Sequence, residues 1–398
     1  MPPDTTYPGV YVEEIAGGIH PIPGVPTSDG AFVDFFPTGA LETGIKIKSF
    51  AEFEKEFGGL DSRSEASYAI QQFFLNGGGV AWVVRVAASH EPGSPEWHNG
   101  AGADAILGRG GERKGIYALR GTGFNILCLP AAANLCPSSL KTVYEEAVKF
   151  CHEQRAFLIA DPPPDIDTPD KAVHWLDQSN GITRDPSAAL YFPRVMVPDP
   201  RAKSPRNLGA SGTMAGVYAR TDAQRGVWKA PAGIDASLCG VELVSHLTDT
   251  ENGKLNPLGI NVLRRFPTHG NVCWGSRTLA GADQLGSDWK YIPVRRTALF
   301  IEESIYRGTE WVVFEPNGEP LWAQLRLNIG AFMHSLFRQG AFQGASPEDG
   351  YFVKCDSATT TQSDIDLGVV NILLGFAPLS PAEFVVIRIQ RMTGQTAC

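Results

Sequence analysis

Several sequence signatures of catalysis are missing from this chain of 398 residues. It contains no GxSxG, HExxH or Walker motif, so it lacks the local patterns of a hydrolase nucleophile elbow, a zinc metalloprotease and a P-loop nucleotidase. Its eight histidines are dispersed, without the spacing of metal ligands. We therefore expect a protein that is not an enzyme, with no catalytic residues, no cofactor and no metal site.

Disulfide, membrane-spanning and nucleic-acid-binding patterns are missing too. The seven cysteines are scattered, odd in number and form no CxxC pair, which indicates reduced thiols. No apolar run is long enough to cross a bilayer, and the start of the chain lacks the charged and apolar regions of a signal peptide. The net charge of −9 arises from interleaved acidic and basic residues, which argues against a nucleic-acid partner.

Both ends of the chain have the pattern of β-strands. Tyr7–Ile15 opens the chain, and Pro381–Gln390 closes it with a run of β-branched and aromatic residues. A terminal apolar strand with open edges is a liability unless something pairs with it. We therefore expect a polymer subunit that exchanges strands with its neighbours. The residues expected to make these contacts are Tyr7, Val10, Tyr11, Val12, Glu13, Phe384, Val385, Val386, Ile387 and Ile389.

Between these arms, strands alternate with helices. Residues 16–26 are rich in glycine and proline and are expected to form an extended linker. Short continuous apolar runs at Ile126–Leu129, Ala156–Ala160 and Ala188–Phe192 are typical of buried strands in a β/α layered domain. The sequence predicts a mixed α/β and α+β, multi-domain fold. Its expected parts are an N-terminal arm and linker (1–26), an N-terminal part of the body (27–100), a layered β/α middle domain (101–275), a C-terminal α+β domain (276–380) and a C-terminal arm (381–398).

Further elements follow from periodicity and capping. Ser49 and Glu52 have the spacing of a capping box that opens a helix ending at Phe57. Other helices are expected at 66–75, 140–151, 171–176, 212–221, Ile292–Tyr306 and Pro320–Gln339, and other strands at Gly30–Phe36, Val80–Val86, Ile260–Phe266, Val272–Trp274, Trp311–Phe314, Tyr351–Cys355 and Val369–Phe376. The helix Pro320–Gln339 has an apolar stripe and an opposite, mildly polar face of Gln324, Asn328, Ala331, Ser335 and Arg338.

An acidic cluster leaves an enzymatic interpretation open. Asp161, Asp165 and Asp167 follow a predicted buried strand, at the end where β/α domains bind ligands. The three prolines between them stiffen the loop, so we favour a structural turn over a catalytic carboxylate cluster. The alternative to a polymer subunit is an α/β hydrolase-like enzyme that uses the middle domain around Asp161.

A basic cluster has two interpretations as well. Arg220, Arg225 and Lys229 lie around Asp222 in the sequence. They suit either an anion-binding site or an internal network of ion pairs and hydrogen bonds that fixes this corner of the fold. We favour the network.

A set of motifs in chain order resembles the contractile tail sheath proteins of phages, R-type bacteriocins and contractile injection systems. The matching stretches are Tyr7–Glu14 (YPGVYVEE), Phe74–Gly78 (FLNGG), Val83–Val86 (VVRV), Ala219–Asp222 (ARTD), Arg225–Gly233 (RGVWKAPAG), Ile260–Val262 (INV), Trp274–Leu279 (WGSRTL), Tyr291–Arg296 (YIPVRR), Phe314–Asn317 (FEPN) and Pro381–Phe384 (PAEF). They span nearly the whole chain, and only the region from about 88 to 115 departs from the pattern.

The resemblance implies a tail-sheath fold and a structural function without a nucleotide. Six subunits are expected to form a ring around an inner tube, rings to stack helically, and terminal arms to add strands to neighbouring subunits. Contraction would then drive the tube through a target envelope. Expected partners are other copies of the chain, the tube protein, a baseplate and a terminator or cap protein, with no membrane insertion.

The resemblance also implies a surface and a location. The tube-facing candidates are Arg338, Asn328 and Gln324. Assembly is expected in the bacterial cytoplasm, as part of a phage tail or tail-like particle. Another tail component, such as a tube or baseplate protein, remains an alternative.

Overall fold

A computed structural model of the chain describes residues 20–108, 113–177 and 182–384. The predicted strand Tyr7–Ile15 and its contact residues lie outside these ranges, as do Val385, Val386, Ile387 and Ile389. Of the ten predicted arm residues, only Phe384 is described, and it is 75% exposed.

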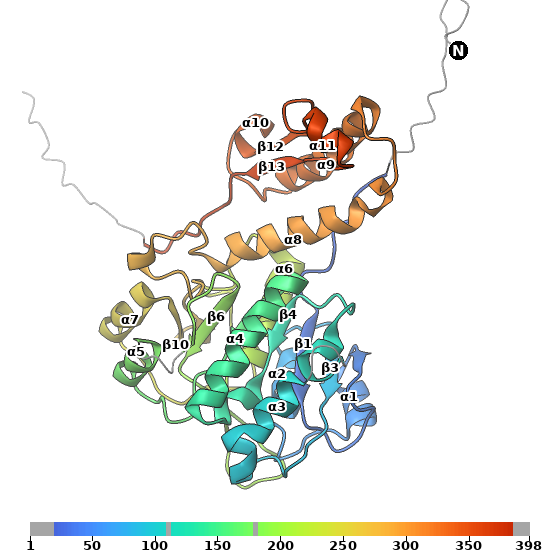
Figure 1. Ribbon diagram of the computed structural model, residues 1–398. Coiled ribbons are helices and arrows are strands. Elements are labelled where there is room, and N and C mark those ends of the chain that lie inside the picture. Colours follow the sequence, from blue (N-terminus) through green and yellow to red (C-terminus); the bar gives the residue numbers. More distant parts are fainter. Residues whose placement is uncertain (1–19, 109–112, 178–181, 385–398) are drawn as a thin grey trace, which may run out of the picture.

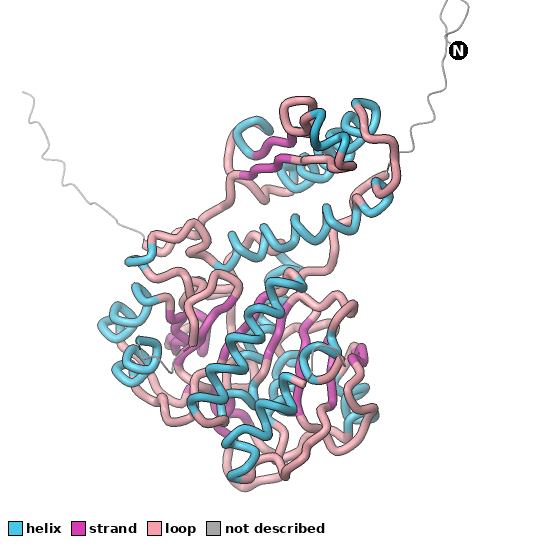
Figure 2. Tube along the Cα trace, viewed as in Figure 1, coloured by secondary structure: helices cyan, strands magenta, loops and turns pink. Residues whose placement is uncertain are grey.

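An eight-stranded sheet organises the larger part of the molecule, here called the sheet unit (Figures 1 and 2). Its strand order is β11-β10-β6-β5-β4-β1-β3-β2. The strands are β1 (Gly30–Asp34), β2 (Gly44–Ile47), β3 (Ala81–Arg85), β4 (Ile126–Cys128), β5 (Phe157–Ala160), β6 (Ala188–Phe192), β10 (Ile260–Phe266) and β11 (Gly270–Cys273). All neighbouring pairs are parallel except β2 with β3 and β10 with β11 at the two edges.

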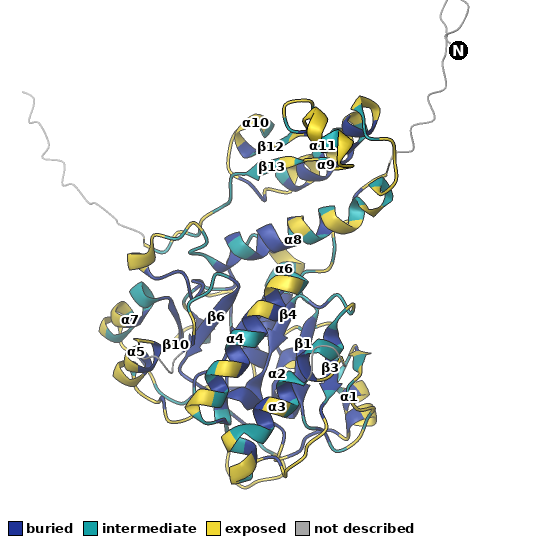
Figure 3. Ribbon diagram, in the orientation of Figure 1, coloured by how far each residue is buried: buried dark blue, intermediate teal, exposed yellow. Residues whose placement is uncertain are grey.

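Helices cover both faces of this sheet, which explains the continuous apolar runs. Along β4, the side chain of Leu127 joins one core, whereas those of Ile126 and Cys128 join the core on the other face. The first face packs against α3 (Gly102–Leu107), α4 (Pro137–Gln154), α5 (Pro169–Asp177) and α7 (Asp249–Leu255). The second packs against α1 (Phe50–Phe57), α2 (Glu65–Leu75) and α6 (Ser211–Arg225). The central strands β1, β4, β5 and β6 are buried at every position, as Figure 3 shows in dark blue.

The expected division between residues 27–100 and 101–275 is not a boundary in the fold. Strands β1, β2 and β3 lie in the same sheet as β4, β5 and β6, and β1 pairs with β4 directly. Both segments therefore share one core on each face. A small antiparallel sheet of β8 (Arg206–Leu208), β7 (Val195–Val197) and β9 (Glu242–Leu243) completes this unit.

Helix α1 begins close to the predicted capping box, with one partner changed. The side chain of Ser49 accepts a hydrogen bond from the backbone N–H of Glu52, as expected. The Glu52 carboxylate accepts instead from the backbone N–H of Lys48, one residue before the cap. The predicted helix that ends at Phe57 is confirmed, and its Phe53 and Phe57 side chains are fully buried.

A smaller unit, the C-terminal unit, lies beyond the long helix α8 (Ile292–Gly308) in Figure 1. It consists of α9 (Glu319–Arg338), α10 (Pro347–Gly350), β12 (Tyr351–Lys354), α11 (Gln362–Asp366) and β13 (Leu373–Phe376). Helix α8 contributes to two cores, because Ile292 and Leu299 pack with the sheet unit and Ile301 packs with α9. The predicted mixed α/β and α+β fold class is confirmed.

Two predicted strands differ from the structure. Trp311–Phe314 is not a strand: Glu310–Val312 forms a 3-10 turn, and the Trp311 indole N–H donates to the carbonyl of Gly308. The apolar side chains of residues 311–314 lie at the end of a helix, where some are packed and others protrude. No strand lies beside this segment in the described part of the chain. Of the predicted strand Val369–Phe376, only β13 is a strand.

Candidate inter-subunit surfaces

Helix α8 holds the segment through which the N-terminal arm joins the body. The His20 ring stacks on Trp311 at 4.2 Å between centroids. Ile22 is only 8% exposed and packs against Gly308, where a Cβ would meet its side chain at 2.7 Å. The backbone N–H of Val25 donates to Ser304 Oγ at 3.1 Å. Residues 20–26 form no helix or strand, as expected of the linker, and they are docked on α8.

A buried ion pair fixes the end of that docked segment. Arg296 on α8 donates to both carboxylate oxygens of Asp222 on α6, at 2.9 and 2.6 Å, and both side chains are 4% exposed. Arg296 also donates to the carbonyl of Thr27 at 2.8 Å, and the Thr27 hydroxyl donates to Asp222 at 2.7 Å. The predicted network at this corner exists, but Arg296 is the cation that pairs with Asp222. Arg220 donates instead to backbone carbonyls.

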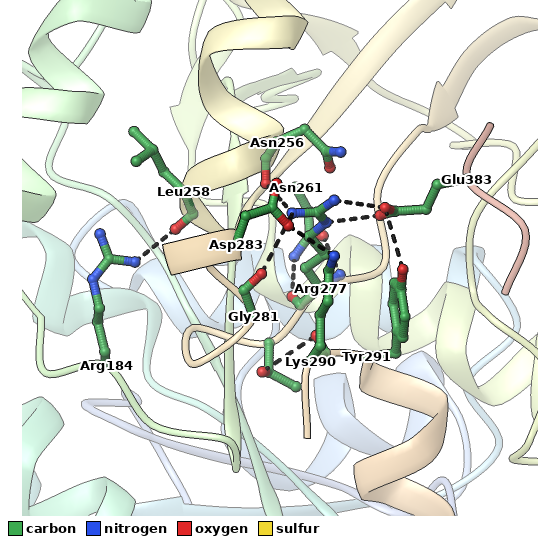
Figure 4. Close-up of polar contacts among 11 residues, drawn as sticks. Arg184, Asn256, Leu258, Asn261, Arg277, Gly281, Asp283, Lys290, Tyr291 and Glu383 are labelled. Carbon is green, nitrogen blue, oxygen red and sulfur yellow. Dashed lines mark hydrogen bonds and ion pairs between the residues drawn. The ribbon is translucent and has the colours of Figure 1, made fainter. Parts of the chain in front are cut away.

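A second ion pair holds the segment that leads to the C-terminal arm (Figure 4). Arg277 is 1% exposed and donates from Nε and Nη2 to the two carboxylate oxygens of Glu383, at 2.8 and 2.6 Å. Its Nη1 donates to Asp283 at 2.9 Å, and the Tyr291 hydroxyl donates to Glu383 at 3.3 Å. This bidentate pair has the geometry that makes arginine–carboxylate contacts strong and directional.

The contacts that hold the roots of the two arms lie at opposite ends of α8. Tyr291 is the N-cap residue of α8 and contacts Glu383, whereas Trp311 follows the last turn of the helix and contacts His20. A helix of 17 residues is about 25 Å long at 1.5 Å per residue. Both arm roots are therefore mounted on one rigid element with a fixed separation.

The sheet of the C-terminal unit has open edges. β12 pairs with β13 only, in antiparallel register from Tyr351 opposite Phe376 to Lys354 opposite Leu373. One face packs on the core of α9, whereas Phe352 and Leu373 on the other face are 46% and 52% exposed. Among the described residues no third strand covers either edge, so backbone donors and acceptors there are available to an added strand.

The exposed face of α9 differs from the predicted polar face. Asn328 is 5% exposed and lies within the apolar stripe, three residues after Leu325 and four before Phe332. Gln324 is half-buried and Arg338 is exposed. Three residues of the predicted face, Ala331, Ser335 and Arg338, are exposed, and Leu327 (63% exposed) and His334 complete the face that reaches solvent. The period of 3.6 residues should have placed Asn328 with the core, because its neighbours at i−3 and i+4 are both apolar.

The acidic turn after β5 has a structural function. Asp161 is buried and accepts hydrogen bonds from the backbone N–H and hydroxyl of Ser211 at the start of α6, at 2.9 and 2.5 Å. Burial raises its pKa to about 6, against the opposing hydrogen bonds from Ser211. Asp165 and Asp167 are exposed, and Asp167 pairs with Lys171. Residues 20–108, 113–177 and 182–384 contain no cluster of three acidic, histidine or cysteine side chains suited to a metal ion.

No helix in the described ranges is both long and apolar enough to cross a bilayer.

A family model and a curated protein match this chain in sequence. The family described as phage tail sheath C-terminal domain matches residues 284–391. A prophage major tail sheath protein of Pseudomonas aeruginosa (strain UCBPP-PA14) is 26% identical over 292 residues, which cover 71% of each chain.

Solved structures match over almost the whole chain. The helical sheath of the anti-feeding prophage in its contracted state shares 30% sequence identity, with a TM-score of 0.72 over 97% of this chain and 99% of that one. The sheath complex of the extracellular contractile injection system PVC, also contracted, gives a TM-score of 0.74 at 27% identity and covers 97% and 98% of the two chains.

Proposed function

The chain belongs to the family of contractile tail sheath proteins and is a structural subunit of a contractile sheath, and we propose that its subunits stack as six-membered rings around an inner tube and are tethered through their terminal arms. The observation that carries the tethering is the pair of open edges on the β12–β13 sheet, together with two strand-patterned arms rooted at opposite ends of α8. Two edges provide places for two arms from neighbouring subunits.

The energies favour arms as permanent tethers. A strand exchange with around five backbone hydrogen bonds contributes roughly 5 kcal/mol at about 1 kcal/mol each, before any apolar burial. An exposed ion pair between subunit bodies contributes about 0–1 kcal/mol. We therefore propose that the arm strands persist through contraction while polar contacts between bodies break and re-form.

The inner tube is the proposed partner of the exposed face of α9. Leu327 and Ala331 provide a small apolar surface on this face, and Arg338 provides a charge near its end. Baseplate and cap proteins would engage the sheath at its two ends. The particle is proposed to assemble in the cytoplasm, as a phage tail or tail-like structure.

The hydrolase alternative has no support at Asp161. Its two carboxylate oxygens are occupied by Ser211, and the side chain is 1% exposed. A substrate therefore cannot reach this carboxylate without displacing the start of α6.

Deletion of residues 385–398 tests the tethering. This truncation keeps Glu383 paired with Arg277, so the body should fold and melt like the full chain. It should form no sheath cylinders in electron micrographs and sediment as small species. Cylinders of normal length from the truncated chain would contradict the exchange of C-terminal strands.

A further inference from the structure

A large cleft lies between the sheet unit and the segment leading to the C-terminal arm. Its volume is about 1090 Å³. Its walls come from the loop Arg225–Gly233, the end of α7, the end of α9 and the extended segment Leu379–Phe384. Trp228, Trp274 and Phe384 give it an aromatic lining.

Two cations of this cleft have no carboxylate partner among the described residues, Arg225 and Lys229. The two carboxylates in its lining are already paired, Asp249 with Arg264 and Glu383 with Arg277. The cleft therefore suits an occupant that is acidic and partly apolar.

A protruding turn on the same molecule has these properties. The turn of residues 312–315, here called the Phe314 turn, is closed by a 3.0 Å hydrogen bond from the Glu315 N–H to the Val312 carbonyl. Phe314 is 102% exposed and Val313 is 65% exposed. Glu310 and Glu315 are exposed, and neither forms an ion pair in the described part of the chain.

The backbone of this turn is unfavourable for the residue it carries. Val313 has φ −64° and ψ 123°, and Phe314 has φ 75°, the left-handed value that a type II turn requires at its third residue. Glycine adopts this conformation readily, whereas a phenylalanine is disfavoured there. Among the described residues nothing covers the Phe314 side chain in return. Such a strained, fully exposed aromatic residue is expected where another molecule compensates for it.

We propose that the Phe314 turn of one subunit inserts into this cleft of a second copy in the sheath. The charges are complementary, because the two carboxylates at the turn and the two cations in the cleft form no ion pair in the described part of the chain. The geometry is head-to-tail: the turn follows the C-terminal end of α8, whereas the cleft wall at Glu383 contacts its N-cap residue, Tyr291. A contact between two different surfaces of the same chain repeats from subunit to subunit rather than closing a dimer. The inference rests on the proposed sheath function.

Phe314→Gly separates this contact from a structural function of the side chain. Glycine suits the left-handed position, so the variant should melt at the same temperature as the natural chain or higher. Its critical concentration for polymerisation should rise by about tenfold or more, the loss typical of truncating an aromatic residue at the centre of an interface. A lower melting temperature, or an unchanged critical concentration, would overturn the proposal.

Charge reversal tests the pairing itself. Two double variants should each polymerise poorly. One reverses the charges of the Phe314 turn (Glu310→Lys with Glu315→Lys), and the other reverses those of the cleft (Arg225→Glu with Lys229→Glu). A chain that carries all four substitutions should regain most of its polymerisation, because attraction is restored with opposite signs. Reversal of exposed charges elsewhere, Glu54→Lys with Lys203→Glu, is the matched control and should assemble normally.

The outcomes distinguish the contact from the sheath function. If the natural chain polymerises and the four-residue swap assembles no better than either parent variant, the two surfaces do not meet and only the contact is overturned. Natural chains that never polymerise, alone or with the tube protein, would contradict both the contact and the proposed function.

Discussion

The guanidinium of Arg277 and the carboxylate of Glu383 lie 106 positions apart in the sequence and share two hydrogen bonds, of 2.8 and 2.6 Å. This pair ties the last described residues of the chain to the loop that precedes α8. The C-terminal arm therefore starts from a fixed point on the body.

Glu383→Gln should loosen that point. The loss of a charge-assisted pair with a buried arginine should lower the free energy of unfolding by about 1.5–3 kcal/mol, and amide exchange of residues 377–384 should accelerate. Urea denaturation and hydrogen exchange measure the two effects. Asp283→Asn is the control: this partner of Arg277 is 48% exposed, so its loss should be under about 1 kcal/mol. Equal effects of the two substitutions would count against a special function of Glu383.

Asp222→Asn should destabilise the fold strongly. It leaves the buried Arg296 without its counter-charge, and breaking such a pair typically lowers the free energy of unfolding by about 3–5 kcal/mol. The double variant Asp222→Leu with Arg296→Met removes both charges and should be more stable than Asp222→Asn. Chemical denaturation decides it, and a double variant less stable than the single one would show that the charges themselves stabilise this corner.

Asp34 should make stability depend on pH. Burial raises its pKa from 3.8 to about 7, although the N–H groups of Ala66 and Phe35 and the Ser64 hydroxyl oppose the shift. Between these two pH values the folded state holds a proton that the unfolded state has lost. The free energy of unfolding should therefore fall as pH rises from about 4 to about 7, on the order of 4 kcal/mol from this group, and change little above that.

Asp34→Asn isolates this contribution. The natural chain, unlike the variant, should lose stability across this range, and the difference between their free energies of unfolding at pH 5 and pH 8 is the quantity to measure. Asp161, whose pKa is raised to about 6, contributes with the same sign in both proteins and cancels. Parallel curves for the two proteins would refute the assignment to Asp34.

Leu327→Glu should separate tube binding from folding. Leu327 is 63% exposed, so the subunit should keep its stability to within about 0.5 kcal/mol. Co-purification with the tube protein should fail, and Arg338→Glu should weaken it as well. Leu75→Glu, at a leucine 53% exposed on α2, is the matched control. Normal binding of tube by the Leu327 variant would exclude this face of α9.

The sequence predicted the central strands of the sheet unit well, because a strand that is buried on both faces is apolar at consecutive positions. Ala156–Ala160 and Ala188–Phe192 are apolar at every position, and helices with clear stripes separate the strands. The same composition led to the wrong prediction of a strand at Trp311–Phe314. Residues that are β-branched or aromatic also occur where side chains cover a helix end or protrude into solvent. Pattern alone does not tell these environments apart.

The anchors could not be predicted from local patterns. Arg277 and Glu383 both lie outside helices and strands, and their pairing depends on how α8 brings distant segments together. The sequence grouped Asp222 with Arg220, Arg225 and Lys229 because these cations are near it in the chain, whereas its partner in the fold is Arg296. Asn328 could have been placed correctly, since its position in the helical period is that of a core residue.

Helix α8 also bears on how a sheath built by arm exchange can change shape. A helix does not stretch, so the distance between the two arm roots of each subunit is the same before and after contraction. Each subunit then acts as a rigid strut that turns about two pivots, the roots of its arms. A lattice of such struts becomes shorter only when the struts tilt away from its long axis, and the same tilt makes it wider. Shortening and widening are therefore one coupled movement with a single degree of freedom.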